Sequence, residues 1–304
     1  MNYAKEECCI GRGLAAITPN QDKVSSGFIY WLLKGKHKEL NLQGTGSTFK
    51  AISRKVLEEI KVPDIELKKQ TELAGSLEKV YSVIQLRKQQ LEELDILIKA
   101  RFVEMFGDPV SNPFNYDKVR LSQIADIKIG PFGSLLHKED YIENGHPLVN
   151  PSHIVDSKIS VDNKLTISNE KYEELGAYKL QIGDVVMGRR GEMGRCAVVL
   201  EDGLLCGTGS ILIRPTQNVT ADFIQKIISF PSFKKTIEDM AVGQTMPNLN
   251  VPIVSNFEII HPPVEVQKSY YDFVTQVDKL KVEVQKSLDE MQILFDSLMQ
   301  EYFG

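Results

Sequence analysis

The sequence predicts an α+β fold. A domain with a strand-rich core is joined to two long helices that pack as an antiparallel coiled coil, and an incomplete domain precedes them. Three observations lead to this prediction: residues 70–107 and 267–304 both follow a heptad pattern, the two stretches align without a gap, and short Val- and Ile-rich segments lie between them. Heptads place apolar side chains on one stripe of a helix, whereas short Val- and Ile-rich segments between turn residues are typical of strands.

The two long helices carry apolar residues at spacings of three and four, and neither contains Pro. Each would span on the order of 55 Å, too far to bury its stripe under its own loops. Polar interruptions in one copy align with apolar residues in the other, as Arg87 does with Val284. Because a compact domain separates the helices, we expect them to return antiparallel and bury their stripes together. The alternative is a coiled coil that only lengthens the protein. The expected pairing residues are Leu77, Val80, Ile84, Leu91, Leu94, Ile98, Val274, Val277, Val284, Leu288, Met291, Phe295 and Leu298.

The repeat also divides the chain into domains. Gly207-Thr208-Gly209 has a counterpart in Gly11-Arg12-Gly13, but nothing before Met1 corresponds to residues 108–197. Residues 1–60 are therefore expected to hold strands and helices without their apolar partners. Leaving such an apolar surface exposed to water costs about 25 cal/mol per Å², so we expect a partner chain, a rearranged remnant or local disorder. The expected parts are the C-terminal part of a first domain (1–63), a first helix (64–107), a complete second domain (108–263) and a second helix (264–304).

The second domain alternates short predicted strands with helices. Val and Ile are frequent in the strand segments, and Gly, Asn and Asp separate them. Strands are expected over residues 120–129, 147–149, 182–187, 196–200 and 210–213, and helices over 221–229 and 232–240.

Composition limits the class of protein. The chain has 304 residues, 42% of them hydrophobic and 25% charged, which suits two modest domains with connecting helices. No apolar run is long enough to span a membrane, and the polar N-terminus is no signal peptide, so we expect a cytoplasmic protein. Four Cys without metal-ligand spacing read as free thiols. The net charge of −5 means that any DNA-binding surface must be a local patch.

Catalytic patterns are missing from the sequence. The five His occur singly, and adjacent pairs such as Glu173-Glu174 diverge on a regular element. Residues 111–114 (SNPF) lack the second Pro of the motif with which adenine methyltransferases hold their target, and a turn is the better reading. The sequence therefore favours a binding protein.

The most informative loop runs from Met187 to Arg195. It places three Arg among three Gly between two predicted strands. Such a loop lets backbone and guanidinium approach a phosphate or a guanine edge, although a solvated hairpin tip is the plain alternative. Polar residues in other loops also suit base edges or backbone, and equally suit turns. The candidate DNA contacts are Lys128, Ser134, His137, Lys138, Asn150, His153, Arg189, Arg190, Arg195, Thr208, Gln244, Thr245, Asn248, Arg12, Ser47, Thr48 and Lys50.

Taken together, the repeat and its order resemble the specificity subunit of a type I restriction-modification system. In that family two target-recognition domains alternate with two long helices that pack antiparallel as a spacer. The segments that carry the resemblance are 102–109 (FVEMFGDP), 119–125 (VRLSQIA), 180–187 (LQIGDVVM), 262–267 (PPVEVQ) and 298–304 (LMQEYFG).

The resemblance implies a non-catalytic subunit that reads double-stranded DNA and directs methyltransferase subunits, with restriction subunits in the full complex. It implies that S-adenosylmethionine, ATP and Mg²⁺ bind the partners and that this chain binds no cofactor. The incomplete first domain suggests a truncated or half-type subunit that self-associates to restore a second reader. The alternative is a scaffold or regulatory remnant that holds methyltransferase subunits without reading DNA. No membrane is implied as a partner.

Overall fold

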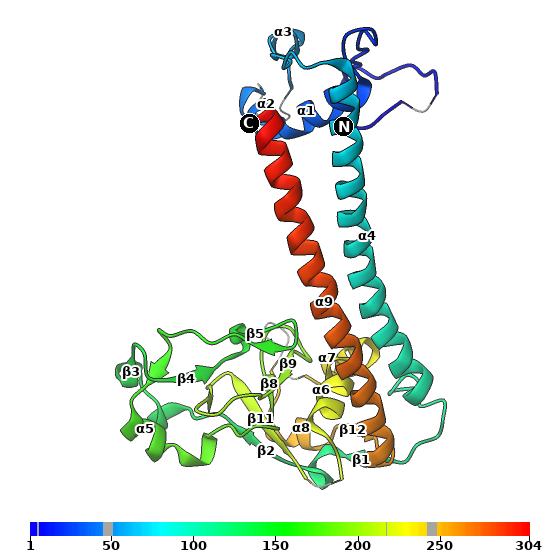
Figure 1. Ribbon diagram of the computed structural model, residues 1–304. Coiled ribbons are helices and arrows are strands. Elements are labelled where there is room, and N and C mark those ends of the chain that lie inside the picture. Colours follow the sequence, from blue (N-terminus) through cyan, green and yellow to red (C-terminus); the bar gives the residue numbers. More distant parts are fainter. Residues whose placement is uncertain (5, 45–50, 217, 242–247) are drawn as a thin grey trace. The chain divides into compact units, whose positions relative to one another are not determined.

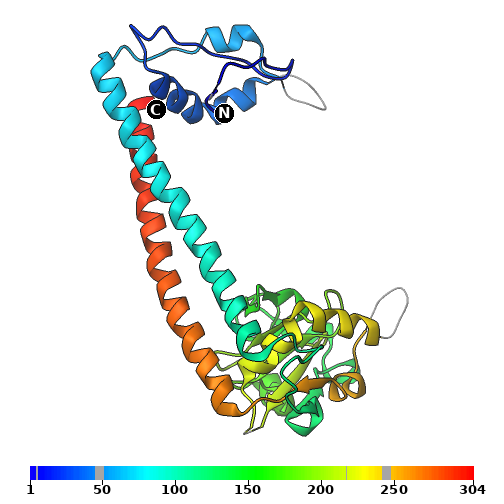
Figure 2. The same cartoon turned by 90° about the vertical axis from the view of Figure 1, so that its right-hand side faces the viewer.

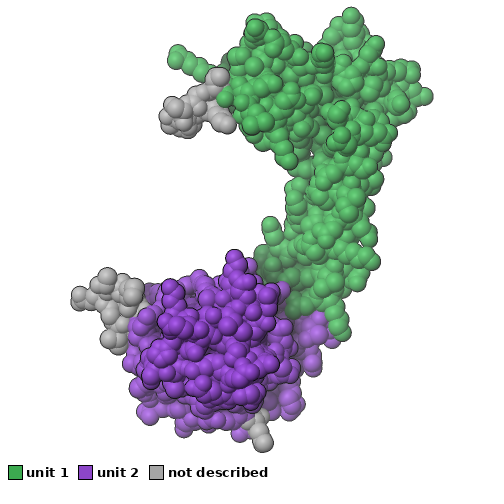
Figure 3. Space-filling model, turned by 90° about the vertical axis from the view of Figure 1, so that its left-hand side faces the viewer, with its two compact units in different colours: residues 1–96, 277–304 green, residues 97–276 purple. Residues whose placement is uncertain are grey.

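The protein forms two compact units. The computed structural model describes residues 1–4, 6–44, 51–216, 218–241 and 248–304. Unit 1 comprises Met1–Ile96 with Val277–Gly304, and unit 2 comprises Leu97–Gln276 (Figure 3). The division falls within both long helices, so each helix contributes one part to each unit.

Two 40-residue helices, α4 (Leu67–Phe106) and α9 (Val264–Phe303), pack side by side (Figures 1 and 2). In unit 1 the rings of Tyr81 and Phe295 lie 5.9 Å apart, and in unit 2 the hydroxyl of Tyr270 donates to the carbonyl of Ile98 over 3.3 Å. In these contacts a higher residue number on α4 goes with a lower residue number on α9, so the predicted antiparallel packing is confirmed. An ion pair of 2.7 Å between Asp95 and Lys281 crosses the same seam.

The residues expected in this seam are all at least partly buried. Leu77, Ile84, Val277 and Leu288 are buried outright. The opposite faces stay exposed, as at Leu86, whose side chain is 59% accessible.

Unit 1 adds three short helices to its parts of α4 and α9: α1 (Ser26–Gly35), α2 (His37–Gln43) and α3 (Arg54–Glu58). Trp31 of α1 is 1% exposed, with its ring 5.4 Å from Tyr81 and 5.5 Å from Phe295. The expectation of strands in residues 1–60 is wrong for the part that the structure describes. In unit 2 the segment after Gly209 is a strand because it has a neighbour on each side; residues 14–19 have no described strand to pair with.

All named strands lie in unit 2, where they form two four-stranded sheets, ordered β2-β11-β8-β9 and β10-β4-β7-β3, and two pairs, β1-β12 and β5-β6. The strands are β1 (Lys118–Arg120), β2 (Ala125–Ile129), β3 (Tyr141–Ile142), β4 (His146–Val149), β5 (Ile154–Val155), β6 (Lys158–Ile159), β7 (Thr166–Ile167), β8 (Val185–Gly188), β9 (Cys196–Val198), β10 (Leu205–Cys206), β11 (Ser210–Pro215) and β12 (Glu258–Ile260). The helices are α5 (Asn169–Glu174), α6 (Ala221–Ser229), α7 (Pro231–Met240) and α8 (Val251–Ser255), with 3₁₀ turns at Leu121–Gln123, Gly133–Leu135, Lys138–Asp140, Pro151–His153 and Gly176–Tyr178.

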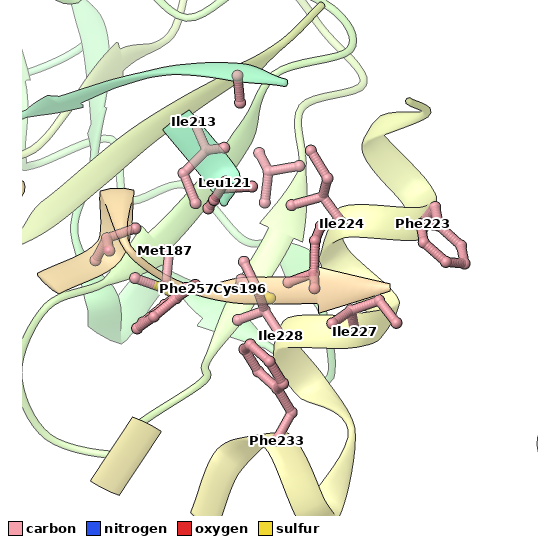
Figure 4. Packing of buried hydrophobic residues seen from close by; sticks show 14 of the residues in the cluster. Leu121, Met187, Cys196, Ile213, Phe223, Ile224, Ile227, Ile228, Phe233 and Phe257 are labelled. Carbon is pink, nitrogen blue, oxygen red and sulfur yellow. The ribbon is translucent and has the colours of Figure 1, made fainter. Parts of the chain in front are cut away.

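The sheet β2-β11-β8-β9 is covered on both faces. Alternate side chains of a strand point to opposite faces, so Val185 and Met187 join one core and Val186 joins another. Phe223 and Ile227 of α6 pack over the first face (Figure 4). Burial on both faces explains why residues 185–187 of β8 and 211–213 of β11 are unbroken apolar runs.

Several predicted strands are shorter than expected. The segment 120–129 is split by a 3₁₀ turn at Leu121–Gln123, where the side chain of Gln123 accepts from the amide of Arg120 over 2.8 Å. The strand expected from residue 182 begins only at Val185, because Gly183 has a φ of +89° and breaks the extended backbone.

Each long helix has a buried glutamine near its start, and the two glutamines make the same contact, one in unit 1 and one in unit 2. Gln70 accepts from the amide of Ser25, the N-cap residue of α1, over 3.0 Å. Gln267 accepts from the amide of Thr220, the N-cap residue of α6, over the same distance.

An aromatic contact at the other end of each long helix is repeated as well. The end of α9 makes this contact in unit 1, and the end of α4 makes it in unit 2. The ring of Phe28 in α1 lies 5.1 Å from that of Phe303 in α9. The ring of Phe223 in α6 lies 5.1 Å from that of Phe106 in α4. The repeat found in the sequence therefore extends to α1 and α6.

The four thiols fall into two classes. Cys8 and Cys9 are exposed, whereas Cys196 and Cys206 are buried, and desolvation raises the pKa of each buried thiol to about 12. Because the thiolate is the nucleophile, a maleimide at pH 7.5 should label two cysteines in the native protein and four after unfolding in guanidinium chloride. Mass spectrometry of the intact chain counts the labels, and rapid labelling of Cys196 in the native state would contradict the packing of β9.

Candidate nucleic-acid interface

The arginine loop predicted from the sequence closes a hairpin between β8 and β9. The strands pair with Met187 opposite Cys196, and the amide of Gly188 donates to the carbonyl of Arg195 over 2.9 Å. Gly191 and Gly194 have φ values of +81° and +73°, a left-handed backbone that glycine adopts without strain. The turn therefore depends on the glycines of the motif.

Arg189 and Arg190 are held together by one amide. Nε of Arg189 donates to Oδ1 of Asn248 over 3.0 Å, and Nε of Arg190 approaches the same oxygen at 3.4 Å. The backbone of Arg189 is fixed too, since its amide donates to the carbonyl of Gly209 and its carbonyl accepts from the amide of Leu249. Arg189 is half-buried and Arg190 is exposed.

Two neighbouring cations at this point favour an anion. Burial, followed by the charge of Arg190, lowers the pKa of Arg189. A guanidinium nevertheless stays protonated in proteins, so both positive charges persist. An approaching phosphate, or the acceptor edge of a guanine, would relieve their repulsion and bond to their remaining donors.

A glycine turn brings two more predicted residues to the same place. The amide of Gly207 donates to the carbonyl of Val149, and a Cβ on Gly207 would lie 2.3 Å from Oδ1 of Asn150. Only glycine fits there. Asn150 is half-buried against this turn, and Thr208 is exposed at its tip, directly before the Gly209 carbonyl that holds Arg189.

The other predicted contacts in unit 2 differ in position. Lys128 on β2 and Ser134, His137 and Lys138 in the following loop are exposed. His153 is 6% exposed, with Nδ1 2.8 Å from the carbonyl oxygen of Leu148, so its ring holds a turn together. Arg195 is engaged by Glu192 and by the carbonyl of Pro151.

Five predicted contacts lie outside the described residues, and one lies in unit 1. Arg12 is exposed in a segment without regular structure. The five are Gln244, Thr245, Ser47, Thr48 and Lys50.

Sequence reasoning missed the residues that support the loop. Glu192 and Lys234 form an ion pair of 2.9 Å although 42 positions separate them. No local sequence pattern predicts such a pair. Sequence reasoning also missed the role of the buried glutamines Gln70 and Gln267, which hold the starts of α1 and α6. Their matched positions in the repeat could have identified them. The SNPF segment makes a turn, as predicted: Asn112 has a φ of +49° and bonds both backbone groups of Tyr116.

The residues that the structure describes contain neither a membrane-spanning helix nor a cluster of metal ligands. No helix in these ranges is both long and apolar enough to cross a bilayer. Among the same residues, no three His, Cys, Asp or Glu side chains gather where they could hold a metal ion.

A strand-rich domain joined to a pair of long antiparallel helices is the architecture of a type I restriction-modification specificity subunit. The chain belongs to that family: the model of the type I restriction modification DNA specificity domain matches residues 1–95 and 113–290.

Individual relatives agree with the family. The chain is 21% identical to the type I restriction enzyme MjaVIII specificity subunit of Methanocaldococcus jannaschii, over 86% of this chain and 65% of that protein. It is 19% identical to the EcoBI specificity subunit of Escherichia coli, over 99% of this chain and 70% of that protein. The crystal structure of the type I S subunit from M. genitalium shares the fold, with a TM-score of 0.59 and 17% identity over 93% of this chain and 73% of that chain. The chain thus spans about two thirds to three quarters of these relatives.

Proposed function

We propose that this chain is the DNA-recognition subunit of a type I restriction-modification assembly. It would read a duplex sequence through unit 2 and direct methyltransferase subunits, and restriction subunits in the full complex, to that site. It would perform no catalysis itself, and S-adenosylmethionine, ATP and Mg²⁺ would bind the partner subunits. The single observation that carries the proposal is the Arg189–Arg190 pair held on Asn248 at the tip of the β8–β9 hairpin.

The chemistry of this tip suits a DNA groove. Arginine forms paired hydrogen bonds with the O6 and N7 atoms of guanine, and asparagine does so with adenine. Both Arg side chains also neutralise phosphates, which supplies sequence-independent affinity. With a net charge of −5 for the whole chain, DNA binding has to come from such a local patch.

The long helices supply a surface for the partner subunits. Leu86, Ile96, Val282 and Ile293 lie on α4 and α9 with side chains 59 to 70% exposed. Covering these side chains with another protein would be favourable by about 25 cal/mol per Å² of apolar surface removed from water. We assign this surface to methyltransferase subunits and place the assembly in the cytoplasm, where the thiols of Cys8 and Cys9 would stay reduced.

The test is duplex binding by the chain in complex with its methyltransferase partner, followed over a range of salt concentrations. Arg190→Ala should weaken binding by about 1–3 kcal/mol if the side chain reads a base. If it holds a phosphate instead, the salt slope should fall by about 1. Arg120→Ala, an exposed arginine on β1 of the same unit, is the matched control and should bind as the wild type does. Unchanged affinity of an Arg189→Ala/Arg190→Ala double variant would refute the assignment of the interface.

A further inference from the structure

Glu192 joins two cations beside the hairpin tip. Its Oε1 accepts from Nζ of Lys234 on α7 over 2.9 Å. Its Oε2 accepts from Nη2 of Arg195 over 2.9 Å and from Nε over 3.3 Å. Hydrogen bonds from Lys234 and then Arg195 lower the pKa of Glu192, so the carboxylate is charged at neutral pH.

Arg195 continues this chain of contacts towards Arg189. Its Nη1 donates to the carbonyl of Pro151 over 3.2 Å. The ring of Pro151 in turn fills the space beside two glycines, since a Cβ on Gly188 would lie 3.1 Å from it and a Cβ on Gly209 3.0 Å. Gly188 precedes Arg189 in the chain, and Gly209 accepts the amide hydrogen of Arg189. Arg195 is thus linked through Pro151 to the residue before Arg189 in the chain and to the residue that accepts the hydrogen bond of the Arg189 amide.

The returning side of the hairpin is fixed as tightly. Gly194 lies so close to α6 and α7 that a Cβ would stand 2.6 Å from Cγ of Lys234 and 2.7 Å from the carbonyl oxygen of Ile228. Lys234 therefore contacts the loop twice, with its stem at Gly194 and with its ammonium at Glu192. The loop is held from the helical layer on one side and from the Gly209 turn on the other.

We infer that Lys234, Glu192 and Arg195 form a clamp that positions Arg189 and Arg190 for base reading, and that Arg195 is a positioning residue of the interface. The inference rests on the proposed function and deepens it. Three of the five donors of Arg195 are used inside the protein, and its two arms hold the loop in one geometry. The clamp acts on the discrimination between sequences, because base contacts require alignment and phosphate attraction does not.

The electrostatic effect alone and the loss of the clamp predict opposite changes in DNA affinity for Glu192→Gln, which makes it the decisive variant. Removing a negative charge beside a DNA surface should strengthen binding if the clamp has no role. If the clamp positions the loop, the same change should weaken binding to the target duplex, by roughly tenfold if one paired base contact is lost. Arg195→Lys keeps the charge but replaces the planar fork, whose three nitrogens reach Glu192 and Pro151 separately, with a single ammonium on a flexible stem. It should therefore lose target affinity as Arg195→Ala does, whereas a phosphate-binding Arg195 would tolerate lysine.

The measurement uses the complex of the full chain with its methyltransferase partner and two duplexes: the sequence that methylation mapping identifies and a scrambled sequence of equal length. We expect Glu192→Gln and Arg195→Lys to lower the ratio of target to scrambled affinity, with melting temperatures close to the wild type. Glu201→Gln, the same charge change at an exposed residue of unit 2, should leave the ratio unchanged.

The outcomes separate the two hypotheses. If the wild-type complex binds the mapped duplex no better than the scrambled one, the proposed function fails and the clamp with it. If the wild type discriminates and Glu192→Gln binds the target equally well or more tightly, the clamp alone is overturned.

Discussion

Replacing Arg214 with methionine is expected to destabilise unit 2 by about 3–5 kcal/mol, the cost of breaking a buried ion pair from one side. Asp184 is 2% exposed, and both its oxygens accept from Arg214, over 2.8 and 2.7 Å. Removing the guanidinium leaves the carboxylate buried and, among the residues that the structure describes, with the amide of Gln181 as its remaining donor at 2.7 Å. For a unit of this size, such a loss should lower the melting temperature by about 10 °C.

The two halves of this pair should not be equivalent. The side chain of Arg214 is 33% exposed, so after Asp184→Asn it can turn towards water, and the loss should be smaller than for Arg214→Met. Far-UV circular dichroism during thermal unfolding follows both variants. Arg120→Met, the same replacement at an exposed arginine, controls for general effects of the substitution. If Asp184→Asn proved the more harmful variant, this account of the ion pair would be wrong.

Leu77→Ala is expected to destabilise unit 1 by about 2–5 kcal/mol, the usual cost of a cavity in a packed core. Leu77 is 1% exposed on α4 and belongs to the cluster around Trp31. Trp31 is the only tryptophan of the chain, so its fluorescence reports the unfolding of unit 1 specifically. The midpoint of the fluorescence transition in urea should fall markedly.

Leu86→Ala is the matched control on the same helix, because Leu86 is 59% exposed. It should shift the fluorescence midpoint little. Equal shifts for Leu77→Ala and Leu86→Ala would mean that the two faces of α4 are buried alike in solution, which the antiparallel packing with α9 does not allow.

The helices and the central strands could be predicted because each has a periodic pattern of its own. The heptads of α4 and α9 persist over their whole length, and the gap-free alignment of the two copies predicts their equivalence. Unbroken apolar runs such as 185–187 mark strands buried on both faces. Predictions failed where structure depends on distant partners: residues 14–19 have a strand-like counterpart in unit 2 but no described neighbour to pair with.

The candidate site was predictable in outline only. Three arginines among glycines were interpreted as a loop that approaches phosphate or bases, with a solvated hairpin tip as the alternative. The loop does close the β8–β9 hairpin, and its contact with DNA stays a prediction. The sequence could not distinguish Arg190, which is exposed, from Arg195, which is held by Glu192 and Pro151. That difference depends on Lys234, which lies in α7 and meets Glu192 only after the chain has folded.

The central proposal is that this chain selects the DNA sequence on which the methyltransferase subunit of the proposed assembly acts. Sequencing of methylated bases in cells that express the partner with the wild-type chain, with the Arg189→Ala/Arg190→Ala variant, or without the chain tests it most directly. We predict methylation at one recurring sequence motif with the wild type, and its loss in the other two cultures. Methylation at the same motif in the absence of the chain, or no motif in any culture, would contradict the claim.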